Sequence, residues 1–327
     1  MWRPASLGDY VWEDINHDGQ QNDPSTGSGQ ATTGVNGVTV TLYSNGVPVN
    51  QTQTYTFGGV PGYYTFTNLI SATYSVTFQA PAGYQFTLQD VGADNTDSDV
   101  NAVTGATGNY VLNAGQSIPT VDAGIWRPAS LGDYVWEDLN HDGQQNDGPT
   151  GVNGVPVALL DVNGNVVSTT TTFQGGPANA NGYYTFTNLI SGTYTVSFTL
   201  PAGYTWTQTN VGADGTDSDG VPAGNVAVAG PYVLNAGESN PTVDQGVWRP
   251  ASLGDLVWYD QNHDGVQQPN EPGVPNVQVS LQTPTTTLIA TTSITGYYTF
   301  ENLISGVPYT VTFGQPPTGY TFTLPTV

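Results

Sequence analysis

The chain has 327 residues and carries 26 acidic side chains against three basic ones, which gives a formal net charge of −23. A surface this negative repels nucleic acid and anionic membranes and favours cations as partners. The absence of cysteine excludes disulfides, and no apolar run approaches the roughly 20 residues that a membrane-spanning helix needs.

The composition predicts an all-β fold. There are 41 Gly and 23 Pro but only one Met, and Thr, Val and Tyr are abundant, so strand and turn formers outnumber helix formers. With 37 % hydrophobic residues the chain is too apolar for a disordered acidic tail. We therefore expect folded domains built from strands.

The motif "WRPASLGD" begins at Trp2, Trp126 and Trp248 and marks three tandem copies of a domain-sized unit. The start "MWRPASLGD" lacks the basic and apolar segments of a signal peptide, which suggests a piece of a longer array with its signal and anchor elsewhere. No Gly/Ser-rich spacer separates the units, so stiff joints are expected. The expected domains are repeat 1 over residues 1–124, repeat 2 over 125–246 and an incomplete repeat 3 over 247–327.

Strict alternation of apolar and polar residues predicts half-buried antiparallel strands. In "TYSVTF", Tyr74, Val76 and Phe78 point to one face and the hydroxyl residues between them to the other. Short sequences typical of turns, such as "NG" and "PAG", separate these runs. Seven or eight strands in about 120 residues are typical of a β-sandwich.

An acidic loop of the pattern D-x-N-x-D-G occurs in each unit. Calcium loops place oxygen ligands at positions 1, 3 and 5, a backbone carbonyl at position 7 and a bidentate Glu at position 12. The predicted ligands are Asp14, Asn16, Asp18 and the Gln20 carbonyl in repeat 1, Asp138, Asn140, Asp142 and the Gln144 carbonyl in repeat 2, and Asp260, Asn262, Asp264, the Val266 carbonyl and Glu271 in repeat 3.

Only the third loop has the position-12 Glu, because Ser25 and Pro149 occupy that place in the first two. Either Asp23 and Asp147, at position 10, or a carboxylate from elsewhere in the domain is then needed to complete the site. The alternative to metal is a solvated turn, since Asp, Asn and Gly favour turns by themselves.

A second acidic motif, "GADNTDSD" or "GADGTDSD", predicts a second calcium site, with an exposed acidic loop as the alternative. Its carboxylates are Asp94, Asp97 and Asp99 in repeat 1 and Asp214, Asp217 and Asp219 in repeat 2. Asp9, Asp133, Asp255, Asp122 and Asp244 are candidates either for shared ligands or for strand-end caps. An oxygen-only ligand set indicates Ca²⁺ over zinc or a transition metal.

The segments "LGDYVWEDINHDGQQN", "GVTVTLY" and "GYYTFTNLISATYSVTF" resemble parts of the calcium-binding B-type repeats of serine-aspartate repeat (Sdr) surface proteins. Those repeats are relatives of the collagen-adhesin B (Cna-B) domains. The resemblance implies a transthyretin-like (prealbumin-like) β-sandwich, several calcium ions per repeat and a stalk role in bacterial surface adhesins. Related domains often carry an internal Lys-Asn isopeptide bond, which is impossible in a chain without lysine.

The sequence gives no support for an enzyme. His17, His141 and His263 stand at the non-ligand position 4 of the loops, with no nucleophile motif beside them. Three arginines recur at the unit boundaries, where each is expected to pair with a carboxylate of the neighbouring domain or to stack on its own Trp, as opposed to being solvated. They are Arg3, Arg127 and Arg249.

We therefore predict a calcium-stabilised structural repeat region of an extracellular surface protein. It acts as a rigid stalk, or as the body of a filament in which identical chains associate, with an open strand edge of repeat 3 available for strand addition. The alternative is a carbohydrate-binding module, which requires a contiguous exposed aromatic face in each repeat.

Overall fold

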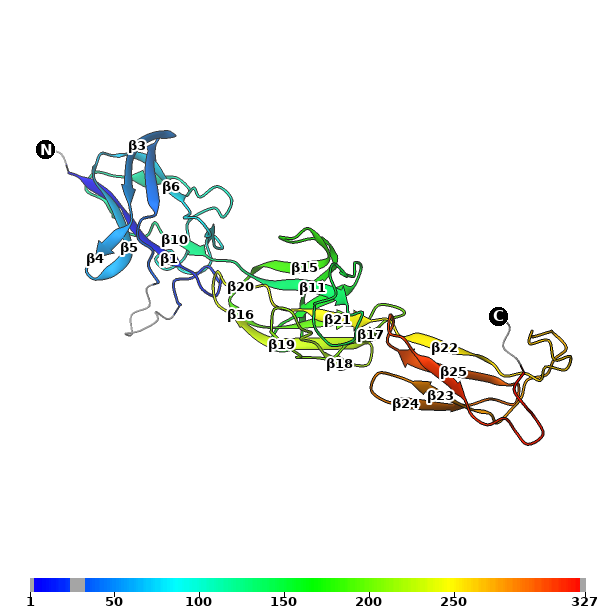
Figure 1. Cartoon of the computed structure of the whole chain (residues 1–327). Coiled ribbons are helices and arrows are strands. Elements are labelled where there is room, and N and C mark those ends of the chain that lie inside the picture. The colour runs from blue at the N-terminus through cyan, green and yellow to red at the C-terminus, as the bar shows by residue number, and fades with distance from the viewer. Residues whose placement is uncertain (1–2, 24–32, 324–327) are drawn as a thin grey trace.

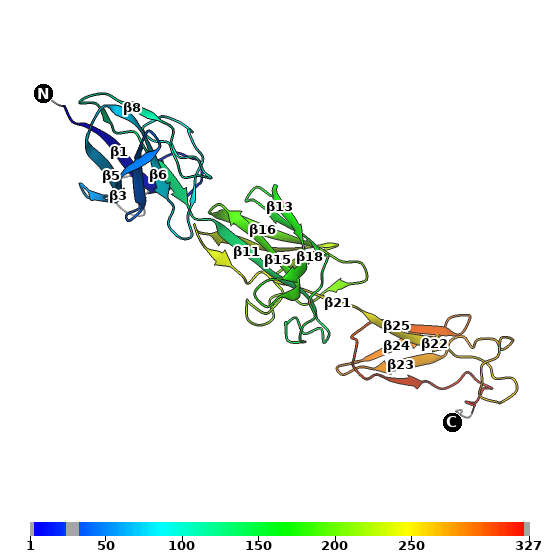
Figure 2. The same cartoon turned by 90° about the horizontal axis from the view of Figure 1, so that it is seen from above.

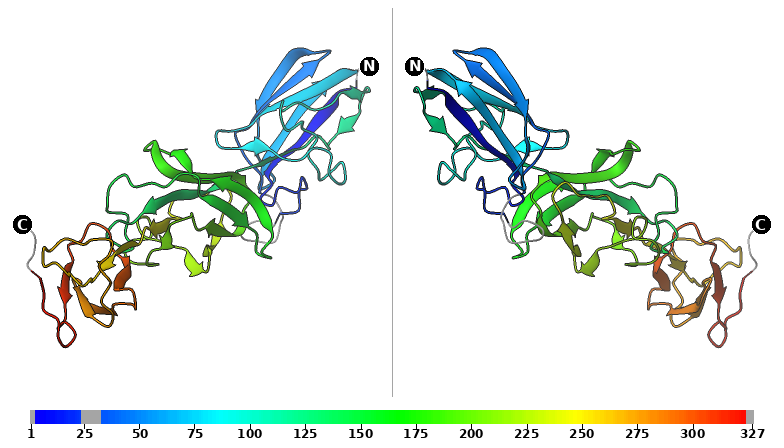
Figure 3. Two further views of the ribbon diagram at one scale, coloured as in Figure 1. Left: turned by 90° about the vertical axis from the view of Figure 1, so that its right-hand side faces the viewer. Right: turned by 90° about the vertical axis from the view of Figure 1, so that its left-hand side faces the viewer.

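The computed structural model describes residues 3–23 and 33–323, in which the regular elements are strands. They form three bodies in a row, and the chain runs from one end of the row to the other (Figures 1 and 2). In the described part, no helix is long and apolar enough to cross a membrane. The two further views in Figure 3 show the same three bodies following one another from the N end to the C end.

Repeat 1 is a sandwich of two sheets. One has the order β4-β5-β1-β10-β7 with β9 also paired to β1, and the other has the order β3-β2-β6-β8. The strands are β1 (Ala5–Glu13), β2 (Thr39–Ser44), β3 (Val47–Gln53), β4 (Tyr55–Phe57), β5 (Val60–Leu69), β6 (Ala72–Gln79), β7 (Gln85–Phe86), β8 (Tyr110–Leu112), β9 (Ser117–Ile118) and β10 (Ala123–Trp126).

Repeat 2 has the same plan, with sheets β14-β15-β11-β21-β17 and β13-β12-β16-β19-β18, and with β20 paired to β11. Its strands are β11 (Ala129–Glu137), β12 (Pro156–Leu160), β13 (Val166–Thr171), β14 (Phe173–Gly175), β15 (Ala180–Leu189), β16 (Gly192–Thr199), β17 (Thr205–Trp206), β18 (Val221–Ala223), β19 (Val226–Leu234), β20 (Ser239–Asn240) and β21 (Gln245–Trp248).

Repeat 3 has one pair of strands, β22-β25, facing a sheet of order β24-β23-β26. These strands are β22 (Ala251–Leu256), β23 (Gln278–Gln282), β24 (Thr287–Thr291), β25 (Tyr297–Leu303) and β26 (Thr310–Phe313). The strand β22 ends three residues earlier than its counterparts β1 and β11, measured from the shared "ASLGD" start.

Each repeat has its own hydrophobic core, built from the inward positions of the alternating strands. In β6, Tyr74, Val76 and Phe78 are buried, as the sequence pattern predicts. The buried Tyr64 donates its hydroxyl to the carbonyl of Val121 at 2.8 Å, which satisfies the polar tip inside the core. The predicted all-β sandwich fold is confirmed.

The final strand of repeats 1 and 2 lies parallel to the first. Strand β10 pairs with β1 in the register Val11 to Ala123 and Trp12 to Gly124, and β21 pairs with β11 in the same way. The fit requires glycine at this point, because a Cβ on Gly124 would lie 2.4 Å from the Thr87 methyl and 2.8 Å from the Trp12 ring.

Candidate metal sites and the joint between repeats

The first acidic loop of repeat 1 follows β1 directly and folds around the carboxylate of Asp14. This side chain is fully buried, and its Oδ2 accepts hydrogen bonds from the Gly19 amide at 2.8 Å and from the Thr87 hydroxyl at 2.5 Å. Gly19 has a φ of +80°, which glycine adopts without strain. The Asp18 carboxylate accepts from the Gln20 amide at 2.9 Å. Oxygen atoms of the predicted ligands therefore organise the loop.

The same arrangement recurs in the other two repeats. Asp138 accepts from the Gly143 amide at 2.8 Å, and Asp260 accepts from the Gly265 amide at 2.9 Å. The amide oxygens of the Asn residues accept from the N–H of the Asp two positions later, at 3.1 Å for Asn16 and Asp18, 2.9 Å for Asn140 and Asp142, and 3.1 Å for Asn262 and Asp264. The loops are local copies of one another.

One further carboxylate closes each loop by accepting the N–H of the second loop residue. That acceptor is Glu271 in repeat 3, at 2.8 Å, whereas Asp23 and Asp147 take the same role in repeats 1 and 2, at 2.8 and 2.7 Å. An Asp at position 10 thus occupies the place of the Glu at position 12. Pro149 is exposed, and Ser25 lies outside the described residues.

The second acidic motif lies directly against the first acidic loop. Gln20 and Asp97 form an antiparallel bridge, and Gln144 and Asp217 form the equivalent bridge in repeat 2. This contact could not be predicted from the sequence, because most of the sandwich separates the two motifs in the chain. Both acidic motifs therefore meet at one end of each complete sandwich.

The carboxylates of the second acidic motif differ in exposure. Asp97 and Asp217 are buried, whereas Asp94 and Asp214 are exposed. Burial raises the pKa of Asp97, and the neighbouring charges of Asp90 and Asp94 raise it further. Asp90 was not among the residues predicted from the sequence.

A second buried acidic group lies deeper in repeat 1. Asp122 is 1 % exposed, accepts the Tyr10 amide through Oδ1 at 3.1 Å, and donates its own amide to Asp99 at 2.6 Å. Burial, with the charges of Asp9 and Asp99, raises the Asp122 pKa to about 9. Burial also raises the pKa values of Asp9 and Asp99 to about 6.

Repeat 2 repeats this group with Asp133, Asp219 and Asp244. Asp244 is fully buried and its pKa is raised to about 9 by burial and by the charges of its acidic neighbours, with Asp133 first among them. Burial raises the pKa of Asp219 to about 7. In repeat 3 the corresponding Asp255 is exposed.

Several buried carboxylate oxygens in these groups have no hydrogen-bond partner among the described residues. They are Oδ2 of Asp122, Oδ2 of Asp244, Oδ1 of Asp217 and Oδ1 of Asp260. Native proteins rarely leave such atoms unpaired, because burying them without a partner is unfavourable. The donor set is hard oxygen only, which fits Ca²⁺.

The side chains alone do not complete such a site. Within residues 3–23 and 33–323, no three acidic or histidine side chains converge closely enough to hold an ion by themselves. Amide oxygens, backbone carbonyls and water would have to supply the remaining ligands, as they commonly do for calcium.

The histidines of the loops have a packing role. The ring of His17 stacks on Trp126 with centroids 4.1 Å apart, and His141 stacks on Trp248 at 4.2 Å. Trp126 ends β10 and Trp248 ends β21, so each Trp belongs to the last strand of the sandwich that contains the stacked histidine. The acidic loop therefore reaches the joint between repeats.

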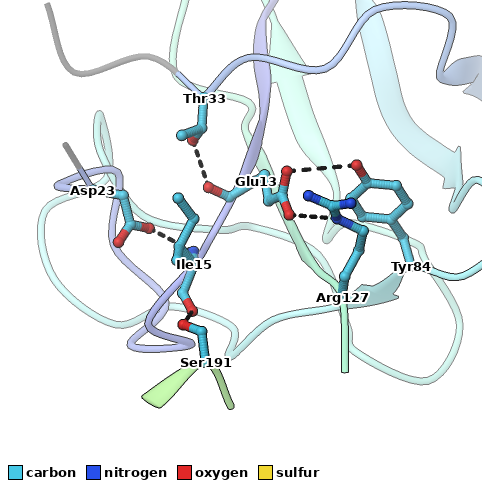
Figure 4. Close-up of polar contacts among 7 residues, drawn as sticks. All are labelled: Glu13, Ile15, Asp23, Thr33, Tyr84, Arg127 and Ser191. Carbon is cyan, nitrogen blue, oxygen red and sulfur yellow. Dashed lines mark hydrogen bonds and ion pairs between the residues drawn. The ribbon is translucent and has the colours of Figure 1, made fainter. Parts of the chain in front are cut away.

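Arg127 stands at the first joint and contacts both repeats. Its Nε donates to Glu13 at 2.7 Å, and its guanidinium lies over the Tyr84 ring with Cζ 5.5 Å from the centroid (Figure 4). The Tyr84 hydroxyl lies 3.5 Å from Glu13. On the other side, the Arg127 carbonyl accepts the amide of Gly237 in repeat 2 at 3.0 Å. The predicted pairing of this arginine with a carboxylate across the boundary is confirmed.

Arg249 repeats this arrangement at the second joint. It binds both carboxylate oxygens of Glu137, at 2.8 and 2.7 Å, and lies over Tyr204 at 4.9 Å. Among the described residues, the aromatic partner of each arginine is therefore a Tyr and not its own Trp, and the Tyr204 hydroxyl lies 3.3 Å from Glu137.

Two further hydrogen bonds join repeats 1 and 2 directly. The Ser191 hydroxyl donates to the carbonyl of Ile15 at 2.7 Å, within the first acidic loop (Figure 4), and Gln85 donates to the Asn188 side chain at 3.2 Å. In the described part of the second joint, the corresponding Ser305 makes no such bond. The two joints therefore differ in their direct contacts.

Aromatic side chains also gather on the outer face of the first sheet. In repeat 1, Tyr63 contacts Tyr10, Tyr55 and Phe57, with centroid distances of 5.3, 5.6 and 4.7 Å. In repeat 2, Tyr183 contacts Tyr134 and Phe173, beside a groove of about 310 Å³ that Asp133 and Asn240 also line. In repeat 3, Leu256 replaces the first Tyr, and the cluster is not continued.

Tandem β-sandwiches with paired acidic loops and close joints define a class of extended repeat modules. The chain belongs to the SdrD B-like domain family, whose model matches residues 5–125, 129–247 and 251–327. The resemblance to Sdr repeats is thereby confirmed.

The chain is similar to serine-aspartate repeat-containing protein F of Staphylococcus epidermidis, with 40 % identity over 95 % of this chain and 17 % of the relative. It is 39 % identical to serine-aspartate repeat-containing protein D of Staphylococcus aureus (strain MW2), over 95 % of this chain and 21 % of the relative. The chain thus spans about a fifth of these curated relatives. Among solved structures, the major pilin subunit of Bacillus cereus matches with 9 % identity and a TM-score of 0.30, over 95 % of this chain and 88 % of that one.

Proposed function

We propose that this chain is a calcium-stabilised stalk segment of an extracellular surface protein, with a structural and not a catalytic role. The observation that carries the proposal is the recurrence of buried, unpartnered carboxylate oxygens at the same places of repeats 1 and 2, in Asp122 and Asp244. A cation between such groups neutralises charges that otherwise repel, so its binding free energy becomes folding free energy.

Three places in each complete repeat would hold the ions. They are the first acidic loop, the second acidic motif that forms a β-bridge with it, and the buried group of carboxylates around Asp122 or Asp244. Sites of modest affinity are sufficient, because extracellular calcium modules commonly work at about 10⁻⁴ to 10⁻³ M.

The position of the first loop links ion binding to the stiffness of the stalk. The Ile15 carbonyl lies in this loop and accepts a hydrogen bond from repeat 2, while His17 packs on the Trp that precedes the joint. A loop ordered by an ion would hold both contacts in place. Loss of the ion would release both, so the joint would become more flexible.

The test is thermal unfolding of the whole chain in millimolar calcium and in chelator, with small-angle scattering of both samples. We expect calcium to raise the melting temperature and to give a longer, narrower distribution of particle dimensions. At 100 times the dissociation constant, one ion adds about 2.7 kcal/mol to the free energy of unfolding. Identical melting and identical scattering in both samples would contradict the proposal. Magnesium serves as the control for a general charge effect.

A carbohydrate-binding role is the second candidate, and the aromatic clusters of repeats 1 and 2 favour it. Tyr55 and Phe57 are 42 % and 57 % exposed, as a sugar platform requires. The cluster shrinks along the chain and is not continued in repeat 3, whereas a binding module needs it in every repeat. A glycan screen against the wild-type chain and a Tyr63→Ala, Tyr183→Ala variant tests this role, because loss of a bound glycan in the variant alone would support it.

A further inference from the structure

One strand lies at the edge of the second sheet in the same place of every repeat. It is β3 in repeat 1, β13 in repeat 2 and β24 in repeat 3, and in the described part of the chain each pairs with a single neighbour. Because β24 has the same place as β3 and β13, this edge is a property of the repeat. An edge strand leaves one row of backbone N–H and C=O groups free to pair with another strand.

Two residues of each edge strand lie opposite the buried residues of the neighbouring strand. They are Asn50 and Thr52 in β3, Ser168 and Thr170 in β13, and Leu288 and Ala290 in β24. Directly opposite residues share a face of the sheet, so these side chains border the core face. The two residues are polar in repeats 1 and 2 and apolar in repeat 3. Polar side chains at this place disfavour a further strand, because its pairing would bury them.

Repeats 1 and 2 protect the edge in a second way. Pro48 lies within β3, and the ladders of β3 and β13 with their neighbours each contain a shift in register. Proline and bulges are common devices that keep a strand edge from pairing. The strand β24 has no proline, and its ladder with β23 runs in register from Thr287 to Thr291. Of the three edges, β24 is therefore the most open to pairing.

The surroundings of β24 carry little charge, although the net charge of the whole chain is −23. Between residues 272 and 323 the only charged side chain is that of Glu301. The apolar side chains of β24 reach the solvent, since Ile289 is 64 % exposed and Leu288 is 36 % exposed. A basic partner would be drawn to the acidic loops, whereas a second copy of this negative chain meets least repulsion at a neutral edge.

The sequence of β24 is also complementary to itself. In an antiparallel pair of two β24 strands centred on Ile289, this residue lies opposite its own copy. The flanking pairs are then Leu288 with Ala290 on the core side and Thr287 with Thr291 on the outer side. Aliphatic pairs and Thr–Thr pairs are favourable neighbours across strands. Such a pair buries the exposed apolar surface of both copies.

We propose that β24 pairs edge to edge, in antiparallel orientation, with β24 of a second copy of this chain. The two three-stranded sheets β24-β23-β26 then form one continuous sheet across a two-fold axis. Main-chain hydrogen bonds supply the affinity, and the side-chain pairs around Ile289 set the register. An interface of five residues per chain is small, so free chains associate weakly. Chains held side by side on one surface would pair more fully, a consequence that rests on the proposed function.

Sedimentation equilibrium of the whole chain, in calcium and about 0.15 M salt, tests the association. We expect a reversible equilibrium between monomer and dimer at high protein concentration. Ile289→Glu places two like charges opposite each other and should weaken the dimer at least about tenfold. Val103→Glu adds the same charge at a residue that is 93 % exposed in repeat 1, and it should leave the dimer unchanged.

A second variant uses residues that repeat 1 itself carries. Leu288→Asn combined with Ala290→Thr gives β24 the polar residues that β3 has at the same places. The sandwich of repeat 1 accommodates these residues, so we expect the variant to fold, with circular dichroism as the check. It should stay monomeric where the wild-type chain forms dimers.

Cysteine crosslinking reports the register. The chain has no cysteine, so Ile289→Cys introduces a single thiol. Directly opposite residues of an antiparallel pair have Cα atoms about 4.5–5.5 Å apart, which suits a disulfide. Mild oxidation should therefore link two Ile289→Cys chains. Val167→Cys is the control, because Val167 is 49 % exposed on the protected edge strand β13 and should give little crosslinking.

Three results would overturn the proposal. A wild-type chain that stays monomeric up to about 1 mM has no such interface. A dimer that persists in Ile289→Glu and in the Leu288→Asn, Ala290→Thr variant is held together elsewhere. Equal crosslinking of the Ile289→Cys and Val167→Cys chains would show random collision. Calcium has no part in this pairing, so the melting experiment and the sedimentation experiment can fail independently.

Discussion

Arg127 and Glu13 form an ion pair, 2.7 Å from Nε to Oε1, that joins the start of repeat 2 to the first strand of repeat 1. The same arginine is tied to repeat 2 through its backbone carbonyl, which accepts the Gly237 amide. One residue therefore contacts both sides of the joint, and the pair Arg249 and Glu137 recurs at the next joint. The same Arg–Glu ion pair therefore recurs at both joints, as the acidic loop recurs in each repeat.

Arg127→Ala should loosen the first joint with little effect on folding. The arginine side chain is 43 % exposed, and exposed ion pairs contribute about 0–1 kcal/mol, so the melting temperature should change little. The distribution of distances between spin labels on repeats 1 and 2 should broaden. Arg3→Ala is the matched control, because Arg3 packs on Gly115 of its own repeat. An unchanged distance distribution would show that the ion pair does not hold the joint.

The two joints should respond differently to removal of one hydroxyl. Ser191→Ala deletes the hydrogen bond to the Ile15 carbonyl and should increase the flexibility of the first joint. Ser305→Ala, at the corresponding position of repeat 3, should leave the second joint as it was. Spin-label distances across each joint give the comparison, and equal responses would argue against a direct role of this hydrogen bond.

Glu271→Gln and Asp23→Asn should have similar effects, because both carboxylates accept the amide of the second loop residue. Without metal, the free energy of unfolding should change little, because the amide oxygen of Gln or Asn still accepts the same N–H. If calcium binds these loops, its affinity for the altered loop should fall at least about tenfold, as measured by calorimetric titration. Glu301→Gln, at an exposed position of β25, is the control. Unchanged titrations in both variants would remove these carboxylates from any ion site.

Stability of the calcium-free chain should fall as the pH rises. The pKa values of Asp122 and Asp244 are raised from 3.8 to about 9, so between these values the folded chain holds protons that the unfolded chain has lost. The free energy of unfolding therefore decreases across this range, and melting in chelator should occur at a higher temperature at pH 5 than at pH 8.

The Asp122→Asn, Asp244→Asn double variant should remove the part of this slope above about pH 7, because Asp9, Asp99, Asp133 and Asp219 titrate at about 6 to 7. The introduced amides stay neutral and still accept the Tyr10 and Tyr134 amides. Saturating calcium should flatten or reverse the slope in the wild-type chain, since the ion binds the ionised form. A slope above about pH 7 that survives in the double variant would assign it to other groups.

Gly246→Ala should destabilise repeat 2 by about 1–3 kcal/mol through overpacking. The added Cβ would lie 2.3 Å from the Thr207 methyl and 2.9 Å from the Trp136 ring. Gly154→Ala is a control for backbone strain without crowding, because Gly154 has a φ of +80° and an open environment. Chemical denaturation of the two variants separates the contributions, and equal losses would contradict the packing argument.

Local patterns were sufficient for the strands and for the first acidic loop. The alternation of Tyr74, Val76 and Phe78 is a period of two, so the buried face could be predicted without the fold. The loop from Asp14 to Asp23 is held by hydrogen bonds between near neighbours, which the D-x-N-x-D-G spacing already encodes. Its closing residue, Asp23 in place of a position-12 Glu, needed the loop geometry.

By itself the sequence determined the all-β class, the repeat and the oxygen-rich loops, because each depends on residues close together in the chain. Only the tertiary structure decided which distant carboxylates share a site. Asp9, Asp99 and Asp122 come together because β1 and β10 lie parallel. Such contacts follow from strand order, which no local pattern records.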